Sequence, residues 1–197
     1  MDRLPAVAPP LLLVALLAAC EEGAPNQPIE RVNAVRADPP RLARPEDFCD
    51  VVAQGEKARI FHYPKLAGAA PSADGRWRWI NVWATWCIPC VEEIPMLVEW
   101  QAQMARSKAG FDLVLVSLDT DDATVDRFRK QHPMTPPSLR LKDPDRAETW
   151  VISLGLDRGA TLPIHVLVDP KGAIRCARTG RVDHGDQAVV QRILTAP

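Results

Sequence analysis

The chain has 197 residues, and its 24 basic and 25 acidic side chains give a formal net charge of −1. This length suits one globular domain preceded by a targeting segment, and the near-neutral charge gives no electrostatic case for nucleic acid binding. The 19 prolines concentrate before residue 72 and around residues 133–137, which indicates a tether and irregular loops and no second domain.

Residues 1–19 have the pattern of a targeting segment. The apolar run over residues 6–19 is interrupted by two prolines and is too short to cross a bilayer core of about 30 Å as a helix. The run ends in small residues before Cys20 and resembles a bacterial lipobox, which implies a lipoprotein signal peptide over residues 1–19 and a lipid on Cys20. An ordinary secretory signal is the alternative. Either signal takes the mature protein out of the cytoplasm, to where disulfides persist, and the lipobox implies lipid anchoring on the periplasmic side of a bacterial membrane.

A proline-rich segment follows over residues 20–46. It contains few large apolar side chains, so we expect a flexible to semi-extended tether, with docking on the domain surface as the alternative. Residues 47–197 form the predicted globular domain.

The first half of this domain contains one strong strand–helix pair. Residues 48–52 and 59–66 alternate weakly and are predicted as short edge strands. Residues 77–83 are predicted as a strand, and residues 87–106 as a helix with apolar residues at helical spacing. Pro95 lies within this helix, where we expect it to produce a kink.

The second half alternates strands and helices. Residues 111–118 are almost continuously apolar, which is typical of a parallel strand covered on both faces. One helix is predicted after the capping residues 119–122 and ends before Pro133, and another covers residues 145–156. A short strand is predicted between them at residues 138–142.

The last part of the chain predicts a hairpin and a helix. Residues 164–169 and 173–178 form an antiparallel pair around the turn 170–172, and the final helix covers residues 185–195. The order of elements predicts an α/β fold with a central mixed β-sheet and helices on both faces.

Two cysteines, Cys87 and Cys90, lie where the predicted strand gives way to the predicted helix. Free backbone N–H groups and the dipole at a helix N-terminus favour a thiolate, and such settings lower a cysteine pKa from about 8.5 to roughly 3.5–7.5. One thiolate can attack a disulfide, and the other can resolve the mixed disulfide that results. A zinc site would need a second ligand pair, which the isolated Cys20, Cys49 and Cys176 do not form. An inert structural disulfide is the remaining alternative.

The five cysteines are an odd number for an exported chain. If Cys20 carries a lipid and Cys87 pairs with Cys90, then Cys49 and Cys176 remain as candidates for a structural disulfide, which would stabilise the fold by roughly 2–4 kcal/mol. Two independent buried thiols are the alternative.

Residues 83–95, Trp-Ala-Thr-Trp-Cys-Ile-Pro-Cys-Val-Glu-Glu-Ile-Pro, resemble the active-site segment of thioredoxin-like proteins of the TlpA/ResA branch, which are membrane-tethered thiol–disulfide oxidoreductases. Residues 161–163, Thr-Leu-Pro, resemble the cis-proline loop of this family, and residues 169–172 resemble the hairpin turn after it. Residues 119–156 resemble the helix-containing insert of the branch. The resemblance covers about residues 46–196 and implies a thioredoxin-like fold.

The resemblance also implies roles for the matching residues. Cys87 would be the exposed nucleophile, Cys90 the buried resolving thiol, and Pro163 a cis-proline, although sequence alone favours a trans X–Pro bond. Glu93 matches a family glutamate involved in proton handling at the thiols, and a first-turn acid favoured by the helix dipole is the alternative. The other implied residues contact the substrate or tune the redox pair: Trp86, Ile88, Pro89, Thr161 and Leu162.

His165 departs from the family, whose members usually carry a small or apolar residue at this place. It would stabilise the Cys87 thiolate or bind a metal if it faced that cysteine, but within a strand we expect packing or hydrogen bonding. The tryptophans other than Trp86 are expected in the core. The dispersed histidines are expected in loops or on the surface: His62, His132 and His184.

These features predict an extracytoplasmic, lipid-anchored and monomeric thiol–disulfide oxidoreductase without a cofactor. A client protein would supply the disulfide and a membrane reductant would recharge the pair; by resemblance the clients include apocytochrome c and copper-site proteins. The alternative is a copper chaperone that binds Cu(I) through Cys87 and Cys90, with His165 as a third ligand. A thiol peroxidase has less support because the chain lacks a Pro-x3-Thr-x2-Cys arrangement.

Overall fold

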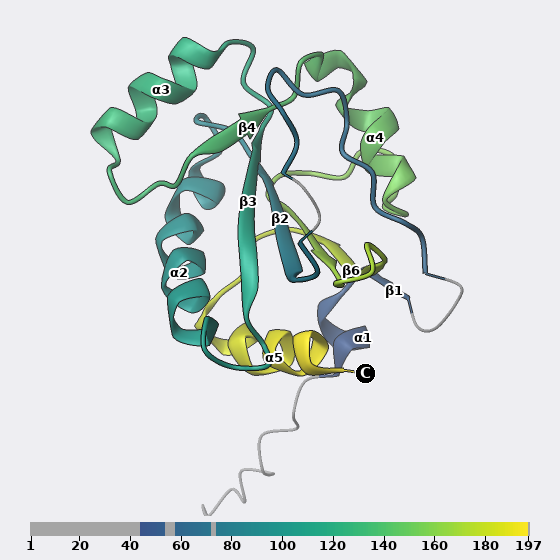
Figure 1. Cartoon of the computed structure of the whole chain (residues 1–197). Helices are drawn as coiled ribbons and strands as arrows, with labels where there is room; N and C mark the ends of the chain where they lie inside the picture. The colour runs from purple at the N-terminus through teal and green to yellow at the C-terminus, as the bar shows by residue number, and fades with distance from the viewer. Residues whose placement is uncertain (1–43, 54–57, 72–73, 197) are drawn as a thin grey trace, which may run out of the picture. The chain divides into compact units, whose positions relative to one another are not determined.

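The computed structural model describes residues 44–53, 58–71 and 74–196 (Figure 1). The predicted signal peptide, Cys20 and most of the predicted tether lie outside the described residues. The described residues belong to one compact unit, Arg41–Pro197. Helix α1 covers Pro45–Phe48, so helical structure begins before residue 47, where the domain was expected to start.

Six strands form one sheet in the order β1-β6-β5-β2-β3-β4. β2 pairs in parallel with β3, and β3 with β4, whereas the other neighbours are antiparallel. This arrangement confirms the predicted mixed sheet, and the predicted hairpin is β5–β6. The strands cover Val51–Val52 (β1), Trp77–Trp83 (β2), Phe111–Ser117 (β3), Ser138–Arg140 (β4), Ile164–Val168 (β5) and Ile174–Thr179 (β6).

The other helices are α2 (Ile88–Met104), α3 (Asp122–Gln131), α4 (Ala147–Ser153) and α5 (Gln187–Thr195). α2 continues through Pro95 to Met104. A short 3₁₀ turn precedes α4 at Pro144–Arg146 and another precedes α5 at His184–Asp186. Within the segments that the structure describes, no helix combines the length and the apolar character needed to cross a membrane.

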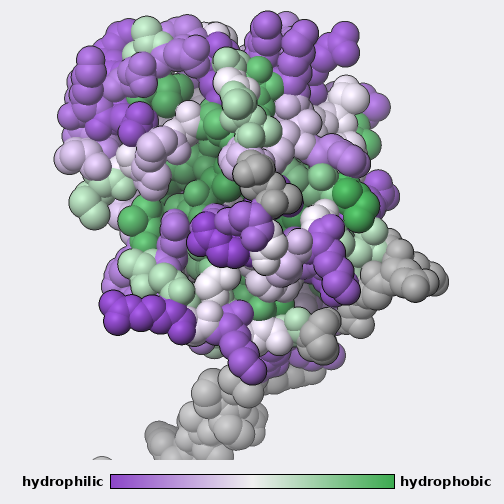
Figure 2. Space-filling model, viewed as in Figure 1, coloured by the Kyte–Doolittle hydropathy of each residue, from purple (hydrophilic) through white to green (hydrophobic). Residues whose placement is uncertain are grey.

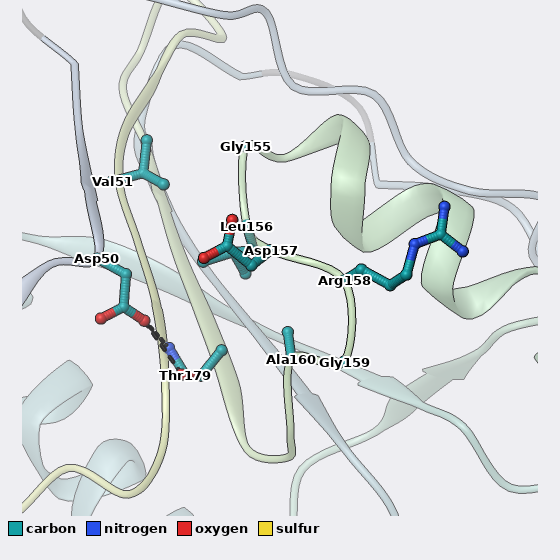
Figure 3. A pocket seen from close by; sticks show the side chains of 9 residues that line it. All are labelled: Asp50, Val51, Gly155, Leu156, Asp157, Arg158, Gly159, Ala160 and Thr179. Atoms are coloured by element: carbon teal, nitrogen blue, oxygen red, sulfur yellow. Dashed lines mark hydrogen bonds between the residues drawn. The ribbon is translucent and has the colours of Figure 1, made fainter.

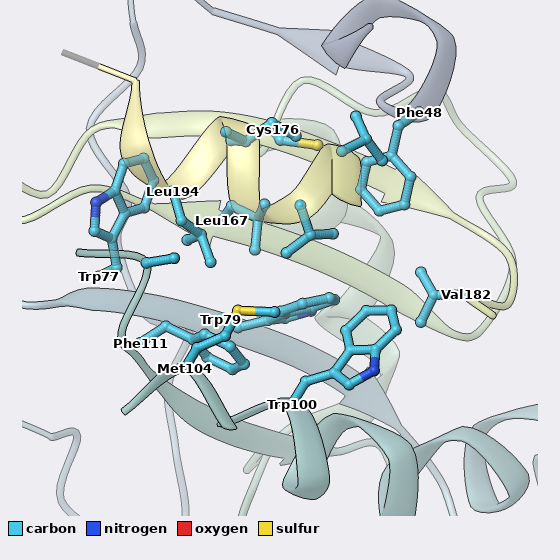
Figure 4. Packing of buried hydrophobic residues seen from close by; sticks show 14 of the residues in the cluster. Phe48, Trp77, Trp79, Trp100, Met104, Phe111, Leu167, Cys176, Val182 and Leu194 are labelled. Atoms are coloured by element: carbon cyan, nitrogen blue, oxygen red, sulfur yellow. The ribbon is translucent and has the colours of Figure 1, made fainter. Parts of the chain in front are cut away.

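The side-chain alternation of β2 divides the core into two layers. All residues of β2 are buried; Trp79 packs toward α2 and α5, whereas Ile80 and Val82 pack on the opposite face with α4. Figure 4 shows Trp79 among Trp100 and Phe111, with the side chains of α5 facing them across the cluster. The Trp79 and Phe111 ring centroids are 5.3 Å apart. Helices therefore cover both faces of the sheet, as predicted.

The two edge strands predicted before β2 are only partly present. Phe48 lies in α1, because Pro45 suits the first turn of a helix, and only Val51–Val52 forms a strand. Residues 59–66 do not form a continuous strand, since Pro64 has no N–H to extend a ladder. This segment makes two isolated bridges: Ile60 with Ala173, and Leu66 with Leu141.

A disulfide joins Cys49 to Cys176. The Cα atoms are 5.5 Å apart, within the usual range of about 4.4–6.8 Å. Both residues are buried in the cluster that contains Trp79, and the bond ties the start of the fold to β6. The alternative of two independent thiols therefore does not describe this fold.

Candidate redox site

The second disulfide joins Cys87 to Cys90 at the N-terminus of α2. β2 ends at Trp83, residues 84–86 form a short connection, and Cys87 is the N-cap of the helix. Pro89 lies in the first turn, where N–H groups have no intrahelical partner and a proline is tolerated. The sequence thus places both sulfurs at the positive end of the helix dipole, and no acidic residue of the first turn opposes it.

Asp119 fixes the connection that precedes Cys87. It is buried after the end of β3 and accepts hydrogen bonds from the Thr85 backbone N–H (3.0 Å) and hydroxyl (2.7 Å). The Ser117 hydroxyl donates a further bond of 2.6 Å to the same carboxylate. Because β2 and β3 are parallel, their carboxyl ends meet at one edge of the sheet. Sequence reasoning treated Asp119 only as a helix-capping candidate; its place directly after a buried parallel strand was the available signal.

The loop before β5 reaches the same disulfide. The Leu162–Pro163 peptide bond is cis, and the Pro163 carbonyl accepts a hydrogen bond of 2.8 Å from the Gly180 N–H. Leu162 packs against the apolar cluster that contains both redox cysteines, whereas Thr161 is exposed. Leu162 therefore connects the cis-proline loop with the cluster that contains the redox pair.

The redox pair is less exposed than the family resemblance implies. Cys87 exposes 6% of its surface and Cys90 none, so the expectation of an openly exposed nucleophile is wrong for the oxidised pair. Cys87 is bonded to buried Cys90 and packs with it in an apolar cluster. The neighbouring Trp86 and Ile88 are 68% and 71% exposed, so two large exposed apolar side chains adjoin Cys87 in the sequence.

Apolar residues continue from the redox pair toward α3. Figure 2 shows apolar side chains at the base of a hollow beneath α3, whose outer surface is hydrophilic. Val91 on α2 and Phe128 on α3 are partly buried and pack against the cluster that contains the cysteines. The helix-containing insert therefore contributes apolar surface next to the redox site.

Glu93 is a buried acid one turn after the redox pair. Its carboxylate accepts hydrogen bonds from Asn81 Nδ2 (2.8 Å) and from the Val182 backbone N–H (3.0 Å). Burial raises the pKa of Glu93 from 4.5 to about 7, against the lowering effects of these donors and of Arg178 and Arg181. A carboxyl group that titrates near neutral pH can exchange a proton during a reaction. Because the first turn of α2 has no acidic residue, the alternative of a first-turn acid is wrong.

His165 faces this acid from β5. Its Nδ1 accepts a hydrogen bond of 3.1 Å from the Trp79 indole N–H and lies 3.3 Å from Asn81 Nδ2, and its Nε2 lies 3.4 Å from Glu93 Oε1. Burial, together with the charge of Arg178, lowers the pKa of His165 from 6.5 to about 3. The ring is therefore neutral at physiological pH, and its contact with Glu93 is not an ion pair.

The copper-chaperone alternative needs His165 as a third ligand. Its Nδ1 is instead bonded to Trp79, and its Nε2 faces Glu93. In the described part of the chain, no group of three His, Cys, Asp or Glu residues is placed to hold a metal ion. The remaining histidines are exposed: His62, His132 and His184.

A surface cavity of about 470 Å³ lies away from these residues, between the α4–β5 loop, β1 and the end of β6 (Figure 3). Asp50 lines it and accepts a hydrogen bond of 2.7 Å from the Thr179 backbone N–H, and the Arg158 side chain extends away from Asp50 (Figure 3). None of the candidate redox residues lines this cavity, so we do not assign the redox chemistry to it.

Replacing Glu93 with glutamine should remove a pH-dependent loss of stability. The pKa of Glu93 is about 7 in the folded protein against an ordinary 4.5, so the folded state binds more protons than the unfolded state between these values. Its stabilising contribution is complete below pH 4.5 and is lost as the pH rises through 7, by about 3 kcal/mol. In urea unfolding of the oxidised proteins at pH 5 and pH 8, Glu93→Gln should therefore lose about 3 kcal/mol less than wild type.

The glutamine can keep the bond from Val182 and donate to Asn81 Oδ1, which has no partner among the described residues. Glu92→Gln is the matched control, because Glu92 is exposed on the same helix, and it should retain the wild-type pH dependence. An unchanged pH dependence in Glu93→Gln would contradict the assignment of this titration to Glu93.

The mixed sheet, the cis-proline loop and the disulfide at the N-terminus of α2 define a thioredoxin-like protein. The chain belongs to the AhpC/TSA family, which matches residues 55–177. Solved structures share the fold. A putative thiol:disulfide interchange protein DsbE from Chlorobium tepidum has a TM-score of 0.53 and 23% identity, covering 73% of this chain and 96% of its own. A thiol:disulfide interchange protein from a Bacteroides species has a TM-score of 0.53 and 20% identity, covering 74% and 92%.

Relatives in sequence carry related names. The thiol-disulfide oxidoreductase ResA of Oceanobacillus iheyensis is 29% identical over 101 residues, which are 51% of this chain and 48% of the relative. The thioredoxin-like protein YneN of Bacillus subtilis is 28% identical over 132 residues, or 66% of this chain and 73% of the relative. The matched part of the chain thus spans about half the length of this ResA relative.

Proposed function

We propose that this protein is a thiol–disulfide oxidoreductase that acts outside the cytoplasm, with Cys87 as the nucleophile and Cys90 as the resolving thiol. The observation that carries the proposal is their disulfide at the N-terminus of α2, beside the cis-proline loop. The names of the sequence relatives support it. The separate Cys49–Cys176 disulfide supports a compartment in which disulfides persist.

The proposed reaction reduces a client disulfide. The Cys87 thiolate attacks one client sulfur, a mixed disulfide forms, and the other client sulfur leaves as a thiolate that takes up a proton. The Cys90 thiolate then attacks the Cys87 sulfur, which releases the second client sulfur as a thiolate and closes the Cys87–Cys90 disulfide. The client gains two electrons and the protein loses two. Glu93, buried one turn from Cys90, is the proposed acceptor of the Cys90 proton.

The proposed client surface lies next to the Cys87–Cys90 disulfide. Trp86 and Ile88 supply exposed apolar side chains, and the backbone beside Leu162 can pair with an extended client segment. Such a surface suits an unfolded or extended chain that carries a disulfide. The residues proposed for client contact are Trp86, Ile88, Pro89, Thr161 and Leu162.

The proposed setting is the periplasmic side of a bacterial membrane, with a lipid on Cys20 and a tether over residues 20–46. A membrane reductant would recharge the pair, and the protein would act as a monomer. Apocytochrome c and copper-site proteins are the proposed clients. These proposals rest on the sequence, because Cys20 lies outside the described residues.

Thiol labelling tests the proposed function. After mild treatment with dithiothreitol, peptide mass spectrometry should find an alkylating label on Cys87 and Cys90, whose thiolates the N-terminus of α2 favours. Cys49 and Cys176 should stay unlabelled, because their bond joins segments 127 residues apart in the folded core. The reduced protein should then reduce the disulfides of insulin and recover the Cys87–Cys90 bond. If the Cys49–Cys176 bond opens first, or if insulin remains oxidised, the proposed function is wrong.

A further inference from the structure

Four polar side chains from three elements meet behind the redox pair. Asn81 on β2 is paired with His165 on β5 in the antiparallel register, and both face Glu93 on α2. Trp79, two residues before Asn81 on the same strand face, completes the group through its indole N–H. All four side chains are buried, so each unpaired polar atom among them carries a desolvation cost.

The hydrogen bond from Trp79 determines which ring nitrogen of His165 carries the proton. An indole N–H only donates, so Nδ1, 3.1 Å away, must be the unprotonated acceptor. In a neutral imidazole the proton is then on Nε2. Nε2 is buried and has no hydrogen bond of standard geometry among the described residues, and Glu93 Oε1 lies 3.4 Å from it. The Nε2–H therefore faces the carboxyl group of Glu93, and the Gly180 backbone is the other hydrogen-bonding group at the ring.

We propose that His165 is a positioning residue for Glu93, with its Nε2–H, fixed by Trp79, stabilising the ionised carboxylate beside the redox pair. This inference rests on the proposed function, in which Glu93 accepts the Cys90 proton. It gives a buried strand residue an effect on the chemistry at the redox pair. A small contraction of the 3.4 Å separation would complete a charge-assisted hydrogen bond when Glu93 ionises.

Other charged groups also face Glu93, and their effect on its ionisation must be distinguished from that of His165. Arg178 lies opposite His165 in the β5–β6 register, and Arg181 follows in the loop after β6 and pairs with Glu92 at 2.6 Å. Both arginines favour the ionised form of Glu93. Before Glu93 in sequence, the nearest titratable groups are Glu92, which is exposed and pairs with Arg181, and then the thiols of the reduced pair. Working with the oxidised protein removes the thiols, and substituting only His165 leaves both arginines in place.

Long-range ¹H–¹⁵N NMR on the oxidised wild-type protein tests the tautomer directly. The expected result is a neutral His165 with the proton on Nε2 at neutral pH, whose Nε2 shift follows the same midpoint as the Glu93 carboxyl in ¹³C NMR. A proton on Nδ1, or an Nε2 shift that ignores the Glu93 titration, would overturn the proposal. This measurement needs no variant and therefore holds whatever the variants do.

Two substitutions then measure the size of the effect. His165→Phe keeps a ring but loses both nitrogens, and we expect the acid-dissociation constant of Glu93 to fall about tenfold, as for loss of a hydrogen bond to a charged group. His165→Gln can accept from Trp79 and donate to Glu93, and it should restore the constant to within about threefold of wild type. His62→Phe, at an exposed histidine, is the matched control and should change nothing.

An unchanged Glu93 midpoint in folded His165→Phe overturns the proposal, as does a shift in His165→Gln equal to that in His165→Phe. If His165→Phe fails to fold, the proposal is tested by the tautomer of His165 in the wild-type protein and by the Glu93 titration midpoint in His165→Gln. These titrations involve no turnover, so they remain valid if the protein proves unable to reduce disulfides. Conversely, the wild-type protein could reduce insulin while His165 carries its proton on Nδ1. The proposed function would then stand, and only the role of His165 would be wrong.

Discussion

Cys87→Ser should reduce disulfide-exchange activity to the level seen without protein, whereas Cys90→Ser should accumulate a mixed disulfide with its client. Cys87 is the N-cap of α2 and retains 6% exposure, so in the proposed function we expect it to be the cysteine that a client disulfide reaches. Cys90 is fully buried in the first turn. A client bonded to Cys87 can therefore be released only by Cys90 or by an added thiol.

Non-reducing gel electrophoresis and mass spectrometry measure this difference. Cys90→Ser should form a disulfide-linked complex with a reporter protein, and dithiothreitol should separate the two by reducing the bond. Peptide mapping should place this bond at Cys87. The double variant Cys87→Ser/Cys90→Ser is the matched control and should capture nothing. Full turnover by Cys90→Ser without a trapped complex would remove the resolving role of Cys90, and capture through Cys90 in Cys87→Ser would reverse the assignment.

The central strands could be predicted from the sequence because their signal is local. Trp77–Trp83 is buried throughout and its predicted bounds match the structure, and Phe111–Ser117 differs from the predicted strand by one residue at its end. The segments before β2 carry weaker signals, and tertiary contacts decide their form: Phe48 enters a helix, and residues 59–66 make only isolated bridges. Strands with one weakly apolar face do not specify their partners by themselves.

The residues of the redox site also divide into those that a local sequence motif predicts and those placed by tertiary contacts. Cys87, Cys90 and Pro163 lie in short motifs, so their arrangement could be anticipated from the family resemblance. The clamp of Asp119 on Thr85 depends on the parallel register of β2 and β3. The meeting of Asn81 with His165, 84 residues later, depends on the antiparallel register of β2 and β5. No local pattern contains that register, so sequence reasoning could state only that His165 would pack or form a hydrogen bond.

The exposure of Cys87 shows a further limit of prediction from a sequence motif. A motif gives the order of residues but not how the neighbouring side chains cover them. In the folded protein Cys87 packs with Cys90 in an apolar cluster, while Trp86 and Ile88 take most of the exposed surface. Within the proposed function, we expect these two exposed apolar side chains next to Cys87 in the sequence to take part in client selection.

The largest loss of stability should follow removal of the Cys49–Cys176 disulfide. The bond closes a sequence separation of 127 residues, for which the chain-entropy relation gives about 5 kcal/mol, at the upper end of the roughly 2–5 kcal/mol measured for native disulfides. Cys49→Ala/Cys176→Ala should therefore lower the free energy of unfolding by about 4–5 kcal/mol. Urea unfolding of the oxidised proteins at one pH measures this change.

The redox pair supplies the matched comparison for this disulfide. The Cys87–Cys90 bond has a sequence separation of only 3, so the same relation gives about 2 kcal/mol for Cys87→Ala/Cys90→Ala. The two double variants should therefore affect stability and activity differently. Removing Cys49 and Cys176 should destabilise the fold more but leave a reducible pair. Removing Cys87 and Cys90 should abolish disulfide exchange with a smaller loss of stability. Equal losses of stability, or loss of exchange in folded Cys49→Ala/Cys176→Ala, would contradict the division into one structural and one redox disulfide.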